Sequence, residues 1–184
     1  MFSERKVAEM AAYLLNKDGG RYAHLKLMKL LYLADREAID KYGYSISGDK
    51  AYSMRHGPVL SNTLDLMSNS VAPQEDGWDY WISDKENHEV SLKRPVDRNS
   101  LEELSESDIE ILDSVWQKFG HMNRWEIRDY THDVCSEWID PNGSSRPIPE
   151  ARILVALGKS KEEALEHLSD LKAEESIDKL FSSI

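Results

Sequence analysis

The segment from residue 24 to residue 42 constrains the fold more than any other part of this 184-residue chain. Its apolar residues cover most of the circumference of a helix, and a helix that is apolar all round must be surrounded by other elements. We therefore predict a central core helix that ends at Gly43, because glycine adopts the left-handed conformation that closes a helix. The apolar positions are Leu25, Leu27, Met28, Leu30, Leu31, Tyr32, Leu33, Ala34, Ala38 and Ile39.

One charged residue, Lys29, interrupts the apolar run of this predicted helix. Lys29 and Tyr32 are three residues apart, so they share a face of the helix. An ammonium group in such surroundings needs a polar partner. Three arrangements remain open: the lysine stem reaches solvent, the amine joins a polar network with His132, or the amine contacts a binding partner.

Apolar periodicity and capping signals predict further helices around the central one. Ser3 is the expected N-cap of the first, and the strings that start at Ser107 and Asn123 both fit the capping-box pattern. The predicted helices cover residues 3–17, 60–68, 107–119, 123–131, 150–157 and 160–184. The last has one apolar face, formed by Leu165, Leu168, Leu171, Ile177, Leu180 and Phe181.

The middle of the chain contains short runs of strand character. Residues 51–55 are predicted to be extended and to lead into a sharp turn at Gly57-Pro58. Residues 78–83 and 89–93 form a predicted hairpin, which should pair with residues 51–55 or lie on helices. Residues 140–149 are predicted to be a loop. The expected fold class is α+β, predominantly α-helical, with a helical core, a small antiparallel β-sheet or hairpin and a C-terminal helix.

The length favours a single domain, which we place at residues 1–158. A C-terminal amphipathic helix follows at residues 159–184, and its apolar face must be covered. The helix packs either on the same domain or on a partner, and a homodimer is one such arrangement.

The net charge of −11 is distributed unevenly along the chain. Residues 1–60 contain 10 basic and 7 acidic residues, whereas residues 61–184 contain 13 and 27. A negative surface repels nucleic acid and anionic lipid and attracts basic partners, so we expect no nucleic acid partner. Neither a membrane-length apolar stretch nor the apolar core of a secretory signal is present, which predicts no membrane association and a cytoplasmic location.

Few residues offer catalytic or metal chemistry. The six histidines include no pair at i and i+4, so a helical zinc site has no local support, although His121 and His132 could join Asp133 in a long-range site. No glycine-rich phosphate loop is present, and we expect neither a metal nor another cofactor. The lone Cys135 is either a small buried hydrophobe or a nucleophile activated by His132. An uncharacterised hydrolase that uses His132, Asp133 and Cys135 is therefore one alternative function.

A group of aromatic residues lies in the predicted hairpin, at Trp78, Tyr80 and Trp81. These side chains either cover the helical core from outside or form an exposed patch of the kind that anchors protein interfaces.

Two strings of the sequence carry a family resemblance. The first runs from Leu25 to Asp35 and is followed downstream by Ala51 to Val59, which ends in Arg55-His56-Gly57-Pro58-Val59. The second is Thr131-His132 ahead of Trp138. Together these strings resemble the Panacea domain, the SocA-like antitoxin family of bacteria and their phages, over about residues 5–140.

The resemblance implies an antitoxin of a toxin–antitoxin system, which neutralises a cognate protein toxin by direct, non-catalytic binding and is not an enzyme. Phage defence is a context that such systems serve. The acidic charge of this chain adds the expectation of a basic surface on the toxin. An alternative from another class is an adaptor that presents a partner protein to a protease.

The resemblance and the aromatic group together give the candidate family-motif or partner-binding residues. They are Lys29, Tyr32, Arg55, His56, Gly57, Pro58, Val59, Trp78, Trp81, His132 and Trp138.

Overall fold

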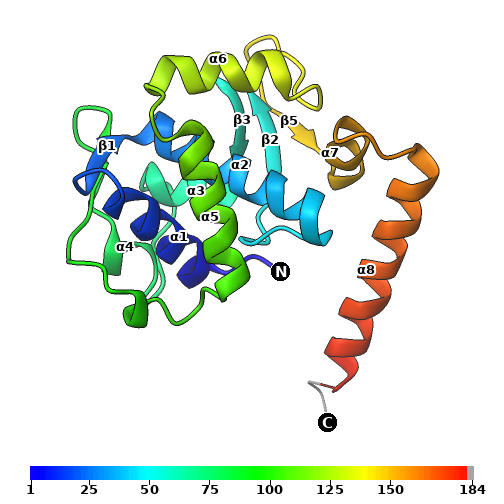
Figure 1. Cartoon of the computed structure of the whole chain (residues 1–184), viewed down its shortest axis with the longest axis horizontal. Helices are drawn as coiled ribbons and strands as arrows, with labels where there is room; N and C mark the ends of the chain where they lie inside the picture. The colour runs from blue at the N-terminus through cyan, green and yellow to red at the C-terminus, as the bar shows by residue number, and fades with distance from the viewer. Residues whose placement is uncertain (182–184) are drawn as a thin grey trace.

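The central helix predicted from the sequence is the axis of the fold. The computed structural model describes residues 1–181, except for the side chains of residue 172 and of residues 174–181. Helix α2, His24–Tyr42, runs through the middle of the domain (Figure 1). Gly43 follows it with φ 83°, so the predicted left-handed glycine cap is confirmed.

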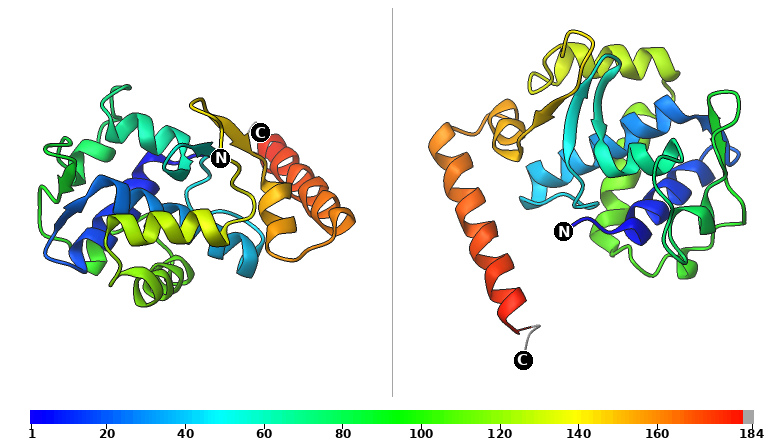
Figure 2. Two further views of the ribbon diagram at one scale, coloured as in Figure 1. Left: turned by 90° about the horizontal axis from the view of Figure 1, so that it is seen from above. Right: turned by 180° about the vertical axis from the view of Figure 1, so that it is seen from behind.

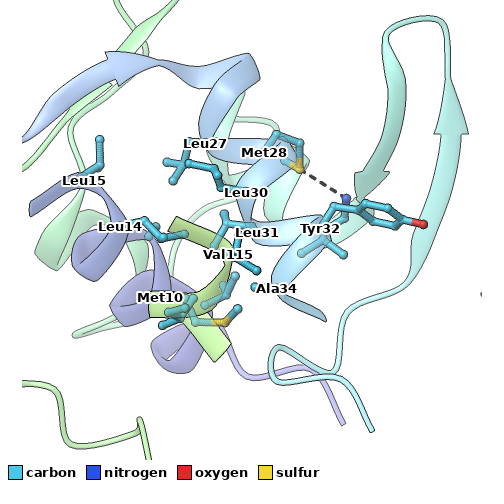
Figure 3. Packing of buried hydrophobic residues seen from close by; sticks show 14 of the residues in the cluster. Met10, Leu14, Leu15, Leu27, Met28, Leu30, Leu31, Tyr32, Ala34 and Val115 are labelled. Atoms are coloured by element: carbon cyan, nitrogen blue, oxygen red, sulfur yellow. Dashed lines mark hydrogen bonds between the residues drawn. The ribbon is translucent and has the colours of Figure 1, made fainter. Parts of the chain in front are cut away.

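Three helices pack around α2: α1 (Glu4–Asn16), α5 (Glu106–Phe119) and α6 (Arg124–Val134). Apolar side chains from α1, α2 and α5 point toward one another and are fully buried (Figure 3). They include Met10, Leu14, Leu27, Leu30, Leu31 and Val115. Burying each large side chain of this kind contributes about 1.5–3 kcal/mol of transfer free energy, so this three-helix contact contributes substantially to stability.

The helix predictions from periodicity and capping are confirmed in most places. The Ser3 hydroxyl caps α1 by accepting from the Lys6 amide at 3.2 Å. Asn123 caps α6 through the predicted capping box, and α6 continues to Val134, three residues beyond the predicted end. The remaining predicted helices are α3 (Ser61–Met67), α7 (Glu150–Ala156) and α8 (Lys161–Phe181).

The N-cap of α5 lies two residues before the predicted one. Its N-cap is Ser105 rather than Ser107, because the Ser105 hydroxyl accepts from the Asp108 amide and the Asp108 carboxylate accepts from the Ser105 amide. Both serines have an acidic residue three positions later, so the local pattern fits either. The buried Asp108 also pairs with Lys6 of α1 at 2.9 Å, and this tertiary contact favours the earlier cap.

Two small antiparallel sheets accompany the helices. In one, strands β2 (Ala51–Met54) and β3 (Gly57–Leu60) form a hairpin, and β5 (Arg146–Ile148) pairs with the other edge of β2. The turn lies at Arg55-His56, so the prediction of a turn at Gly57-Pro58 was two residues late. The predicted loop over residues 140–149 therefore contains a strand, which the local sequence did not reveal because it is only three residues long.

The predicted hairpin over residues 78–83 and 89–93 forms only in part. Trp78–Trp81 is a short helix, α4, and β4 (Glu89–Ser91) pairs with β1 (Arg21–Ala23). The ends of the two predicted arms do pair antiparallel, through a bridge between Ile82 and Leu92 and through backbone bonds from the Ser83 amide to Ser91 and from the Lys93 amide to Trp81. The cause is distant in sequence: the buried Glu4 carboxylate accepts from the amides of Gln74 and Trp78 at 2.9 Å each and fixes the helical turn.

Helices α7 and α8 pack at the end of α2 through a second, smaller apolar cluster. Its members are Ile39, Ile148, Ile153, Leu154 and Ala164. The His167 ring also hydrogen-bonds to the Gly43 carbonyl oxygen. Beyond this contact α8 runs away from the body of the domain (Figure 2).

The predicted apolar face of the last helix is only partly covered. Leu165 is 65% exposed, and Leu168 and Leu171 are half-buried. The side chains of Ile177, Leu180 and Phe181 lie outside the described residues. Within the described chain, none of the helices combines the length and the apolar character that crossing a membrane requires.

The cap of α5 gives a direct test of this fold. Ser105→Ala should lower the free energy of unfolding by about 1 kcal/mol, because it removes the acceptor of the Asp108 amide. Ser107→Ala is the matched control and should change it by less than about half as much, since Ser107 is half-buried and its hydroxyl bonds to the Ser105 hydroxyl rather than to a backbone amide of the helix. Urea denaturation measures both. The reverse order would show that the helix begins at the position predicted from the sequence.

Candidate functional site

The strings that carry the family resemblance meet at one place in the structure. The middle of α2, the β2–β3 hairpin and the C-terminal part of α6 are in mutual contact, and α6 lies across one end of the hairpin (Figure 1). The segment that follows α6, residues 135–139, closes the group. We call this group the motif junction. Because its parts come from distant stretches of the chain, it exists only in the folded protein.

Lys29 is the centre of the motif junction. Its side chain is 0% exposed, and its Nζ donates to the carbonyl oxygen of Pro58 at 2.6 Å. Burial lowers the pKa of Lys29 from 10.5 to about 7. Of the three arrangements left open by the sequence, the route to solvent is therefore wrong: the amine is internal and holds the hairpin.

Gly57 allows the hairpin to approach this amine. It has φ 91°, a left-handed conformation that other residues rarely adopt. An atom placed where a Cβ would be lies 2.9 Å from Lys29 Nζ, 2.8 Å from Thr131 Oγ1 and 3.2 Å from His132 Cδ2. The glycine therefore sits where α2 and α6 converge, and a side chain there would force them apart.

His132 and Trp138 close the junction by stacking. Their rings lie 4.1 Å apart between centroids, with an interplanar angle of 11°. Trp138 Nε1 donates to the Met54 carbonyl oxygen at 3.0 Å, and the Ile139 amide donates to Ser53 Oγ at 3.2 Å. These bonds tie the segment after α6 to strand β2.

The His132 ring is held without a bond to one of its nitrogens. Its Nε2 is buried and has no hydrogen-bond partner among the described residues. Burial, and then the positive charge of Lys29, lower the pKa of His132. The neutral ring is therefore the favoured form, which suits packing against Trp138.

Tyr32 uses the same face of α2 as Lys29, as the spacing predicted, and meets a residue that the sequence analysis missed. Its hydroxyl donates to Glu137 Oε1 at 2.6 Å, and Arg36 Nε donates to the same oxygen at 2.6 Å. Glu137 is 0% exposed, so Arg36 compensates a buried carboxylate. Burial, and next the Glu137 charge, raise the pKa of Tyr32 well above its usual range. In the sequence, the only local signal for this contact was the presence of an acidic residue between Cys135 and Trp138.

Few motif residues reach the surface. Arg55 and His56 form the exposed tip of the hairpin, whereas Pro58 and Val59 are buried beneath it. Burial and the neighbouring charges of Arg55 and Arg128 lower the pKa of His56.

The aromatic residues predicted for an interface patch lie mostly inside the protein. Trp78 and Trp81 are 2% and 4% exposed and pack in the core on helix α4, next to α1. Their spacing of three residues puts both on one face of that helical turn. Only Tyr80 of the three is exposed, and the Arg94 guanidinium covers its ring at 3.3 Å. Trp78 and Trp81 are therefore core residues, which corrects their assignment as interface candidates.

An exposed aromatic residue that the sequence analysis missed lies on α6. Trp125 is 46% exposed, and the guanidinium groups of Arg124 and Arg128 lie 5.0 and 4.8 Å from its ring centroid. Tryptophan and arginine together are the residues most enriched in interface hot spots. The available signal was a tryptophan with arginine at the preceding position and three positions later on a predicted helix.

The geometry gives little support to the hydrolase alternative. Cys135 is buried, and burial raises the pKa of its thiol to about 12, which disfavours the nucleophilic thiolate. The lowered pKa of His132 accompanies a ring nitrogen closed off from solvent. Asp133 is exposed. Among the described residues, no group of three or more His, Cys, Asp or Glu side chains has the arrangement of a metal site.

Fold and junction together define a class of protein: a mainly helical α+β domain whose motif residues fasten three distant segments and leave a hairpin tip exposed. Comparison with protein families then identifies the family within this class. The family described as antitoxin SocA-like, Panacea domain matches residues 27–139, and the chain belongs to this family. The match ends at Ile139, where the segment after α6 is bonded to β2. No curated protein and no solved structure matches the chain.

The close approach at Gly57 gives a quantitative prediction. Gly57→Ala should lower the free energy of unfolding by about 1–3 kcal/mol more than Gly143→Ala. Gly143 has φ 87° and nothing within 4 Å of its Cβ position, so it carries the same conformational cost without the collision. Urea denaturation of the two variants measures the difference. Equal losses would mean that Lys29 and Thr131 do not press against this position.

Proposed function

We propose that the protein is an antitoxin that neutralises a cognate protein toxin by direct, stoichiometric and non-catalytic binding. The observation that carries the proposal is the family match over residues 27–139, whose motif residues form one continuous junction in this chain. Because these motif residues contact one another as one group, the chain is expected to have the function of this family. The raised pKa of the Cys135 thiol supports a role in binding over one in catalysis.

The surface of the domain supports a protein partner. The hairpin tip at Arg55 and His56 is exposed beside α6, and α6 carries the exposed Trp125. Further along the chain, the exposed Val155 of α7 and Leu165 of α8 give apolar area outside the family match. We propose that residues 1–158 form the antitoxin domain and that residues 159–184 add surface specific to this partner.

The charge of the chain supports a toxin with a basic surface and no nucleic acid partner. The excess of acidic residues lies in residues 61–184, and the first turns of α8 add Glu162, Glu163 and Glu166. Opposite charges on two proteins accelerate their encounter and make it sensitive to salt. Association with the toxin should therefore slow as ionic strength rises.

Co-expression with the product of the adjacent gene tests the function. If that product is the toxin, it should stop growth when expressed alone, permit growth when this protein is present, and co-purify with it. Leu165→Ser should weaken the protection, because it removes an exposed apolar side chain of α8. Val71→Ser is the matched control, since Val71 is 45% exposed on a different part of the surface.

Two results would count against the proposal. If the product of the adjacent gene does not stop growth when expressed alone, it is not a toxin, and family membership alone would then support the proposal. Loss of the toxin only when a protease is present would favour the adaptor function. For the electrostatic part, an association rate measured with purified proteins that does not change with salt would contradict the basic surface.

A further inference from the structure

A cavity lies on the side of α2 that faces strand β5. Its volume is about 290 Å³, and it is enclosed by α2, residues 45–50, strand β2 and the segment from β5 into α7. Much of the wall is apolar, from residues such as Ile39, Ala51, Ile148 and Ile153. The outer wall, residues 147–153, lies beyond the family match, so the cavity is completed by a part of the chain that the family does not define.

One wall of this cavity holds a buried carboxylate. Asp35 is 3% exposed, and its oxygens accept from the Ser47 amide and the Ser47 hydroxyl. Among the described residues, the donors bonded to it are neutral, and no cation contributes to its electrostatic environment. Burial accordingly raises its pKa to about 7. A buried carboxylate without a cation is costly, and a cation brought into the cavity would relieve that cost.

The other charged groups of the cavity leave this carboxylate uncompensated. Arg36 lines the cavity, but its guanidinium is paired with Glu137 at 2.6 Å. Lys50 is exposed. Asp49 accepts from neutral donors of Asn62 and Thr63, and Glu150 adds a further carboxylate to the lining.

We propose that this cavity binds the side chain of an arginine or lysine residue from a protein partner. The aliphatic stem lies along the apolar wall, and the cationic group reaches the Asp35 carboxylate. Two observations favour a protein side chain over a free amine. Val155 of α7, the helix that supplies Ile153 to the cavity, is 40% exposed, and Leu165 of α8, which packs on α7, is 65% exposed, so the elements next to the cavity carry apolar side chains that a protein could cover. The inference does not depend on the partner being a toxin.

Titration of the full-length protein with short peptides tests this site. The probe is acetyl-Gly-Arg-Gly-amide, and the control is the same peptide with citrulline, which keeps the shape and lacks the charge. Amide chemical shifts in two-dimensional NMR should saturate with the arginine peptide and change around Asp35, Ser47, Ala51 and Ile148. The citrulline peptide should bind at least about tenfold more weakly, because a charge-assisted hydrogen bond is lost.

Two variants and one small molecule sharpen the result. Asp35→Asn should weaken binding of the arginine peptide about tenfold or more, whereas Asp79→Asn, which alters an exposed carboxylate on α4, should leave it unchanged. The comparison of the two peptides uses the unaltered protein, so it decides the question even if Asp35→Asn does not fold. The inference is overturned if no shifts saturate or if citrulline binds equally well. Binding of agmatine without binding of the peptide would overturn the assignment to a protein side chain.

Discussion

The buried amine of Lys29 is the interaction on which the rest of the structure depends. Helix α2 must be apolar nearly all round because it is the axis of the core. Lys29 is the position at which this helix hydrogen-bonds to the β2–β3 hairpin. The bond to the Pro58 carbonyl oxygen sets the distance between α2 and the hairpin. That distance is short enough to require glycine at position 57.

This arrangement divides the family motif into two parts. Lys29, Tyr32, Gly57, His132 and Trp138 are used inside the protein, where they join α2, the hairpin and the segment after α6. The hairpin tip is the part left on the surface. A domain fastened internally in this way can vary its outer surface without losing its fold, because surface substitutions away from such features usually change stability little. The cavity beside Asp35 lies at the border of this region, since its outer wall is not part of the family match.

Sequence reasoning was accurate where structure is decided locally. The apolar run of α2, the glycine at position 43 and the capping box at Asn123 each act within a few residues, and each was predicted. It failed where distant contacts decide. The carboxylate of Glu4 converts a predicted strand into helix α4 from 74 positions away, and strands β1 and β5 are three residues long and exist through pairing. For the site, helical spacing put Lys29 and Tyr32 on one face, but nothing local indicated Glu137 or the Pro58 carbonyl oxygen as their partners.

The pH dependence of stability, compared between the natural protein and Lys29→Met, tests the buried amine most directly. The folded pKa of about 7 lies below the unfolded value of 10.5, so between these limits the unfolded chain binds more protons and stability rises with pH. The free energy of unfolding of the natural protein should therefore increase between pH 7 and pH 9, relative to the variant, by up to about 1.4 kcal/mol per pH unit. Parallel curves for the two proteins would mean that Lys29 titrates as an exposed lysine, which would contradict the account.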